Sequence, residues 1–135
     1  MKNREDYIEE FHKAYGQGVA EEAKPEVLKL RKILINEEVK EFFVELDEAI
    51  AILERGEEIP KEHWIKMLKE MADIQVVLSG TAVALKPFQK FEEAFVRVHE
   101  SNMSKLGEDG KPILREDGKV LKGPNYFEPD LSDLV

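Results

Sequence analysis

The chain has 135 residues, and 20 basic against 29 acidic side chains give it a net charge of −9. This length suits one domain with a real core, and 42% hydrophobic with 36% charged residues is typical of a globular protein. The absence of cysteine excludes disulfides, thiolate metal sites and cysteine catalysis. The acidic balance argues against a general binder of nucleic acid or of a membrane surface. No segment is typical of a signal peptide or a membrane span, so we expect a cytoplasmic protein.

Two amphipathic helices are predicted in the first half of the chain. Residues 3–15 place aromatic and aliphatic side chains at helical spacing, and Gly16 and Gly18 end that segment. The second helix begins near Pro25 and ends near Gly56. Its expected core stripe is Leu28, Ile35, Val39, Phe42, Leu46, Ala49 and Leu53.

Two further helices are predicted after a short polar loop. The third runs from about Pro60 to Pro87, and we expect His63 in its polar first turn to be exposed. The second half of this helix is apolar on nearly every side, which is typical of a buried helix or of an oligomer interface. The fourth helix follows Pro87 and ends near Leu106.

The composition changes at residues 107–135, which are rich in glycine and proline. Asp117 and Gly118 form a turn dipeptide between two short apolar pairs, which predicts a small β-hairpin. The fold class is therefore expected to be all-α. We predict a bundle of four to five helices with a short C-terminal β-hairpin or irregular tail. The chain would form a single domain over residues 1–135, with a helical core at about 3–106.

Carboxylates on the second and third predicted helices carry the main functional signal. Glu38 and Glu41 differ by about 60° around a helix and so share one face, beside Glu37. Glu70 and Asp73 have the same spacing, and Asp73 enters an otherwise apolar segment. A buried carboxylate requires a cation, a hydrogen-bond network or a proton.

Two such pairs can face one another in an antiparallel bundle, and four converging carboxylates would need a metal. Oxygen ligands select a hard ion such as Mg²⁺, with Mn²⁺ as a substitute, and Mg²⁺ commonly shares phosphate oxygens. A di-iron site is disfavoured because neither motif has histidine at the required offset. The alternative is an ordinary solvated acidic face.

Candidate phosphate-facing residues lie near the C-terminus. Asn102 and Lys105 should share one face at the end of the fourth helix, although a helix-dipole lysine is an alternative. Lys122 precedes an apolar-aromatic turn ending at Tyr126 and Phe127, which could fold over a ligand and bring this lysine to a triphosphate. Surface solubility is the competing explanation for the basic tail. His12 either lines a pocket or flanks the core.

The acidic pattern resembles the signature of the all-α NTP pyrophosphohydrolases, which include MazG proteins, dimeric dUTPases and phosphoribosyl-ATP pyrophosphohydrolases. It reads Glu37-Glu38-x-x-Glu41, then 28 residues, then Glu70-x-x-Asp73. The tail from Asn102 to Tyr126 and the first helix, with Phe11-His12 and Tyr15-Gly16, are similar to the MazG-like dUTPase subgroup. The resemblance therefore covers most of the chain.

This resemblance implies Mg²⁺-dependent hydrolysis of a nucleoside triphosphate to the monophosphate and pyrophosphate, with dUTP or a related nucleotide as substrate. Glu38, Glu41, Glu70 and Asp73 would hold metal, and Glu37 would activate water or bind a further ion. The implied substrate-binding residues are His12, Asn102, Lys105, Lys122 and Tyr126. The resemblance also implies a homodimer or higher homo-oligomer. The alternatives are a phosphoribosyl-ATP pyrophosphohydrolase-like activity, a non-catalytic module that binds nucleotide or protein, and a purely structural helical dimer.

Overall fold

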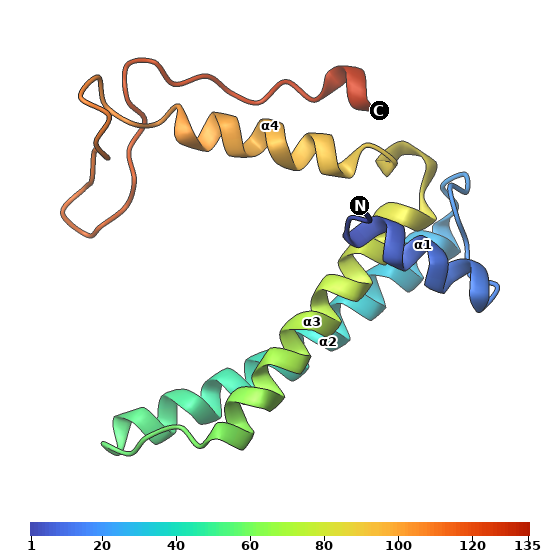
Figure 1. Ribbon diagram of the computed structural model, residues 1–135, viewed down its shortest axis with the longest axis horizontal. Helices are drawn as coiled ribbons and strands as arrows, with labels where there is room; N and C mark the ends of the chain where they lie inside the picture. The colour runs from blue at the N-terminus through green and yellow to red at the C-terminus, as the bar shows by residue number, and fades with distance from the viewer. The chain divides into compact units, whose positions relative to one another are not determined.

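The computed structural model describes residues 1–135 as a mostly helical protein with almost no strand. Four α-helices account for most of the regular structure, which confirms the all-α prediction (Figure 1). The chain divides into two compact units, Met1–Gln89 and Lys90–Val135. The compositional change near residue 107 is thus not the boundary between these units. The assignment of one domain stays a prediction.

Helix α1 covers Arg4–Ala14, as the periodicity predicts. Asn3 caps its N-terminus: the Asn3 side chain accepts from the Asp6 backbone N–H, and the Asp6 side chain accepts from the Asn3 backbone N–H. Gly16 follows the helix with a φ of 68°, a left-handed conformation that glycine adopts without strain. The helix therefore begins and ends where local chemistry requires it.

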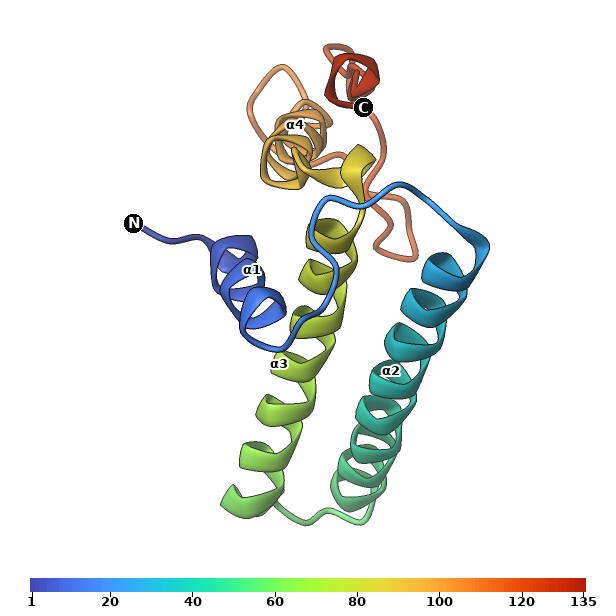
Figure 2. The ribbon, with the colours of Figure 1, turned by 90° about the vertical axis from the view of Figure 1, so that its right-hand side faces the viewer.

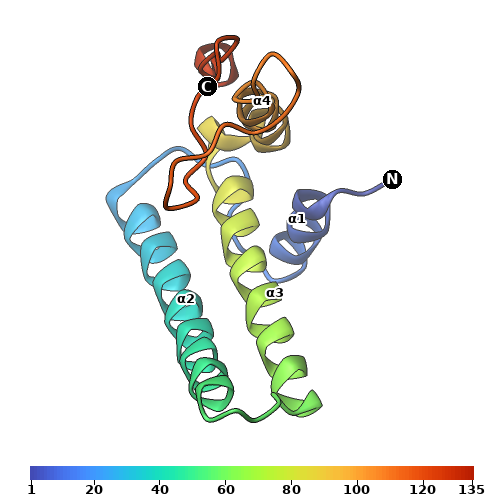
Figure 3. The ribbon, with the colours of Figure 1, turned by 90° about the vertical axis from the view of Figure 1, so that its left-hand side faces the viewer.

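Helices α2 (Pro25–Glu54) and α3 (Lys61–Ala84) form a long antiparallel hairpin, and α1 packs against α3 (Figures 2 and 3). The core between them includes Ala49, Met67, the end of α3 from Ala82 to Ala84, and Leu85 directly after it. The segment before α2 lies along that end, since Glu21 donates its backbone N–H to the Ala84 carbonyl at 2.8 Å.

Two expectations about burial differ from this hairpin. Leu28 and Leu53, placed in the core stripe from spacing alone, are 48% and 58% exposed. They lie near opposite ends of the 30-residue helix α2. The spacing predicts which face of the helix they share but not whether a partner covers that face at its ends. Burial is also uneven along the apolar half of α3, because its end at Ala82–Ala84 is buried whereas Val76 and Leu78 are exposed.

The second unit consists of α4 (Phe91–Met103) and the tail, which returns along this helix (Figure 1). The buried Ser101 hydroxyl donates to the Phe127 carbonyl at 2.8 Å, and Arg97 pairs with Asp133 at 2.5 Å. Helix α4 begins later than predicted, because a 3₁₀ turn at Lys86–Phe88 precedes it. A second 3₁₀ turn, Ser132–Leu134, ends the chain.

The predicted β-hairpin is reduced to a single isolated antiparallel bridge between Leu114 and Val120. The turn at Gly118 does form, with a φ of 88°. Every residue from 111 to 122 is exposed, so no buried face stabilises strands on either side of the turn. No fifth α-helix is present. No helix offers the length and apolar character that a bilayer span requires.

Candidate metal centre

Three carboxylates converge where α2 faces α3. Glu38 and Glu41 come from α2 and Glu70 from α3, and one oxygen of each lies within 4.8 Å of the other two. The antiparallel hairpin creates this group, because it places the middle of one helix opposite the middle of the other (Figure 2). Three negative charges this close repel one another strongly unless a cation or a proton lies between them.

Two of these three carboxylates have an oxygen with no protein partner. Glu38 Oε2 and Glu70 Oε2 are both buried, and neither accepts a hydrogen bond. Burial raises the pKa of Glu38, and the negative charges of Glu41, Asp73 and Glu70 raise it further. The protein thus keeps acceptor oxygens away from water without providing a donor, which is the arrangement expected of groups that bind a cation.

Asp73, the fourth predicted ligand, lies beside this group but is engaged elsewhere. Lys69, one turn earlier on α3, donates to Asp73 Oδ2 at 2.6 Å. The charge of Asp73 nevertheless acts on Glu38. Lys69 occupies Oδ2 alone, so Asp73 could join a metal shell through Oδ1, and it could offer both oxygens only if Lys69 released Oδ2.

Glu37, the predicted catalytic residue, is exposed and stands outside the three-oxygen group. It directly precedes Glu38 on α2, so its side chain leaves the helix about 100° away from that of Glu38. Its catalytic role stays a prediction.

A cavity of about 550 Å³ lies between α2 and the segment that follows α1. His12 lines it, is 2% exposed, and places Nδ1 2.7 Å from the Gly18 carbonyl oxygen. Arg31 lines it too and is only 7% exposed. The Arg31 guanidinium donates to Thr81 Oγ1 at 3.1 Å and to the Val77 carbonyl at 2.9 Å, with no carboxylate bound to it. Burial lowers its pKa.

The sequence interpretation missed Arg31, although a signal existed. Arg31 precedes Glu38 by seven residues, which is two turns, so both belong to one face of α2. Gly80 leaves room for it: a methyl group there would lie 2.5 Å from Arg31 Nη2. The sequence signal for Arg31 was therefore a basic residue on the same helix face as the acidic motif, together with a glycine on the facing helix.

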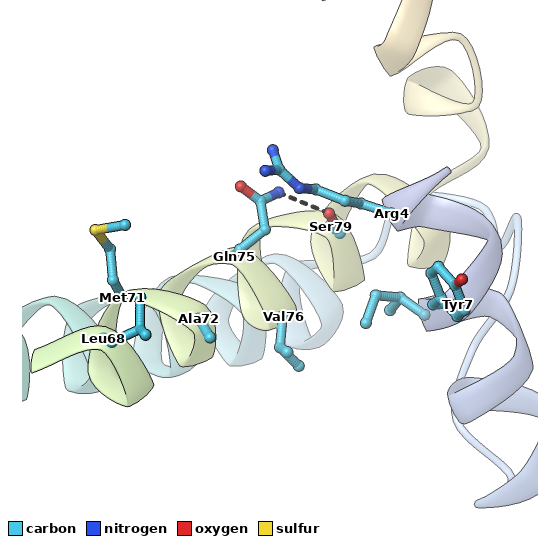
Figure 4. A pocket seen from close by; sticks show the side chains of 9 residues that line it. Arg4, Tyr7, Leu68, Met71, Ala72, Gln75, Val76 and Ser79 are labelled. Atoms are coloured by element: carbon cyan, nitrogen blue, oxygen red, sulfur yellow. Dashed lines mark hydrogen bonds between the residues drawn. The ribbon is translucent and has the colours of Figure 1, made fainter. Parts of the chain in front are cut away.

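A second cavity, of about 370 Å³, lies between α1 and α3 (Figure 4). Its lining is mostly apolar and includes Tyr7, Leu68, Met71 and Val76. The Gln75 amide donates to Ser79 Oγ at 2.9 Å at one side of it (Figure 4). None of the metal-site carboxylates lines this cavity. It opens on the other side of α3 from the face that meets α2.

The predicted substrate-binding residues of the tail gather within the second unit. Lys122 Nζ lies 4.8 Å from the centre of the Tyr126 ring, in a cation–π contact. The Gly123 backbone N–H donates to the Lys105 carbonyl at 2.9 Å, which fixes this turn on the end of α4. Asn102 is exposed on the last turn of α4. Contact of these residues with phosphate stays a prediction.

His63 is not exposed as expected, because its side chain is only 9% accessible. The short loop after α2 places the first turn of α3 against Glu45, and His63 Nε2 lies 2.8 Å from the Glu45 carbonyl oxygen. Spacing within one helix cannot show which residues a tight loop brings together across two helices.

Comparisons of the sequence with models of known protein families and with curated proteins gave no match to this chain.

Proposed function

We propose that this protein is a divalent-metal-dependent nucleoside triphosphate pyrophosphohydrolase that releases the nucleoside monophosphate and pyrophosphate. The observation that carries the proposal is the pair of buried, unpartnered oxygens, Glu38 Oε2 and Glu70 Oε2, within one three-carboxylate group. Such oxygens fit Mg²⁺ or Mn²⁺, which keep open positions for phosphate. The resemblance described above supports dUTP or a related deoxynucleotide as the substrate.

The residues present fit this chemistry. Glu38, Glu41 and Glu70 would hold the ion, together with Asp73, whose Oδ1 is not bound by Lys69. When bound, the ion neutralises phosphate charge and lowers the pKa of bound water. The exposed Glu37 carboxylate would accept a proton from the attacking water as its oxygen bonds to phosphorus and the α–β anhydride bond breaks.

The cavity lined by His12 and Arg31 is the proposed place for the nucleoside. Arg31 and Leu34 both line it and precede Glu38 by seven and four residues on α2. Arg31 is therefore offset from Glu38 by about 10 Å along the helix axis. Glu21 and Glu26 also line the cavity, so it favours the uncharged part of a nucleotide over its phosphates. By the resemblance, lysines of the tail would supply positive charge to the phosphates.

We further propose that the active form is a homodimer or a higher homo-oligomer. On α3, Trp64, Ile65, Leu68 and Met71 are 56%, 58%, 66% and 54% exposed. Two consecutive turns of a helix with this many large exposed apolar side chains are unusual for a monomer. A second copy of the same face would cover them, since an isologous contact pairs one apolar patch with itself.

Pyrophosphate release from a panel of canonical and modified nucleoside triphosphates, with phosphoribosyl-ATP included, tests the activity. We expect Mg²⁺-dependent release that falls by about 100-fold or more in Glu38→Gln and in Asp73→Asn. Asp47→Asn, an exposed acidic residue of α2 outside the group, is the control and should retain full activity. Wild-type turnover in both site variants, or no turnover of any substrate by the wild type, would refute the proposal.

A further inference from the structure

A second group of potential ligands lies nearer the loop that joins α2 to α3. It consists of Glu45 and Glu48 on α2 and His63 in the first turn of α3. One ligand atom from each lies within 4.8 Å of the other two. Glu45 and Glu48 follow Glu41 by four and seven residues, so this group is separate from the centre described above.

Glu45 is the most informative member, because its side chain is only 8% exposed and its two oxygens differ. Oε1 accepts from the Lys66 ammonium at 2.9 Å. Oε2 is buried and has no hydrogen-bond partner. An unpaired carboxylate oxygen inside a protein is costly, so a group that compensates it is expected. The only nearby candidate in the chain is His63, with Nδ1 at 3.6 Å.

The hydrogen bond at the other side of the His63 ring determines what Nδ1 can offer. Nε2 lies 2.8 Å from the Glu45 backbone carbonyl oxygen, and a carbonyl can only accept. Nε2 must therefore carry the proton, so Nδ1 of the neutral ring presents a lone pair. This lone pair faces Glu45 Oε2, which is also an acceptor. Two acceptors that face each other, one of them buried, require a cation or a second ring proton between them. A proton on Nδ1 would draw the two atoms to about 2.7–2.9 Å, whereas they lie 3.6 Å apart.

We propose that Glu45 Oε2, Glu48 and His63 Nδ1 bind a divalent transition-metal ion of the Zn²⁺ type. Two ligands on tetrahedral Zn²⁺, with bonds of about 2.0–2.1 Å, are about 3.4 Å apart, close to the observed 3.6 Å. A metal-bound histidine usually donates its other N–H to a carboxylate or a carbonyl, as His63 does. The imidazole ligand favours Zn²⁺ over Mg²⁺, in contrast to the all-oxygen group at Glu38.

The local charge is compatible with a cation. Glu45 and Glu48 carry two negative charges and Lys66 one positive charge, and Lys66 occupies Oε1 and leaves Oε2 free. Since the ligands come from both helices, the ion would tie α2 to α3 beside the loop at residues 55–60. A bound ion would therefore raise the stability of this end of the hairpin.

Calorimetric titration of the full-length protein with Zn²⁺, in millimolar Mg²⁺ to saturate hard-ion sites, tests the proposal. We expect one Zn²⁺ per chain, weakened at least about tenfold in Glu48→Gln and in His63→Gln. The glutamine amide introduced by His63→Gln can still donate to the Glu45 carbonyl, and Glu48 is exposed, so both changes are mild. Trp64, the only tryptophan, follows His63 directly, so its fluorescence gives a second readout with quenching Co²⁺ or Ni²⁺.

Two controls make the result specific. His99→Gln, an exposed histidine of α4, should bind Zn²⁺ as the wild type does. Glu38→Gln should also retain it, which separates this site from the proposed catalytic centre. Failure of the wild type to bind Zn²⁺ under these conditions would overturn the proposal. Undiminished binding in both Glu48→Gln and His63→Gln would overturn it as well.

Discussion

Most substitutions at partly buried sites destabilise a protein. Replacement of Glu38 by glutamine should instead stabilise this protein in the absence of metal. The change keeps the side-chain shape and removes one of three negative charges whose oxygens lie within 4.8 Å of one another. It also supplies an N–H donor to a group of oxygens that has none. Glu38 makes no ion pair that the change would lose.

The size of this stabilisation follows from the distance between the carboxylate oxygens. At 4.8 Å, two unit charges repel by about 3.5 kcal/mol at an effective dielectric constant of 20 and by about 0.9 kcal/mol in water. Glu41 is exposed, so its contribution lies toward the lower value. Burying an imperfectly paired amide costs about 1–3 kcal/mol in return. With two such neighbours relieved, we expect Glu38→Gln to raise the free energy of unfolding by about 1–3 kcal/mol.

The negative charges around Glu38 also make the stability of the metal-free protein depend on pH. The pKa of Glu38 in the folded chain is raised above its ordinary value of 4.5, so the native state binds this proton more tightly than the unfolded state. In the absence of metal, the contribution of Glu38 to the free energy of unfolding is therefore greatest at low pH. It falls as the pH rises from 4.5 through the raised pKa. Glu38→Gln should lack this component of the decline, and saturating Mn²⁺ should suppress it in the wild type.

Urea denaturation with a chelator and again with saturating Mg²⁺ or Mn²⁺ measures both effects. With metal at 100 times its Kd, the wild type gains about 2.7 kcal/mol. The variant, which lacks a ligand, gains less, so its stability advantage over the wild type should shrink when metal is added. Glu37→Gln, next in the chain but outside the group, should gain as much from metal as the wild type does. If Glu38→Gln is less stable than the wild type in chelator, the group is not under the repulsion inferred here.

Two further predictions concern the tail and the apolar face of α3. Gly123→Ala should release the tail from α4, because a methyl group there would lie 2.3 Å from the Leu106 carbonyl oxygen, and faster amide exchange at Phe127 would report it. Gly118→Asn, in open space, should leave that exchange unchanged. Leu68→Asp should shift sedimentation from oligomer to monomer, and an unchanged sedimentation coefficient would exclude this face as the contact.

The helices could be predicted from the sequence because their ends depend on local chemistry. Asn3 and Gly16 bound α1, and Pro25 starts α2. Between these ends, the helical spacing of the apolar residues predicts the helix. The predicted β-hairpin is present only as a turn with one antiparallel bridge, because Asp117 and Gly118 specify a turn but not the buried face that strands need. Local signals thus define where an element begins and ends, whereas its burial depends on partners that the sequence does not name.

The carboxylate group illustrates how far such reasoning extends across two helices. Spacing alone predicts which face Glu38, Glu41 and Glu70 occupy, and an antiparallel hairpin then brings them together. The pairing of Asp73 with Lys69 was not predicted, although the two are four residues apart on one helix. An i,i+4 ion pair is visible in any sequence, but whether it forms depends on competing charges nearby. Here the competitors for Asp73 are all carboxylates, so the lysine prevails in the absence of metal.

That competition also bears on the net charge of −9. An acidic chain repels a triphosphate unless cations lie between them, and Lys69 is the one cation bound directly to a member of the proposed ligand set. If a metal takes Asp73 Oδ2 into its shell, Lys69 is released beside the site and becomes available to a phosphate oxygen. Metal binding would then add positive charge twice, once with the ion and once by freeing the lysine. Lys69→Met should therefore tighten metal binding while weakening nucleotide binding, whereas a lysine with only a structural role would affect neither.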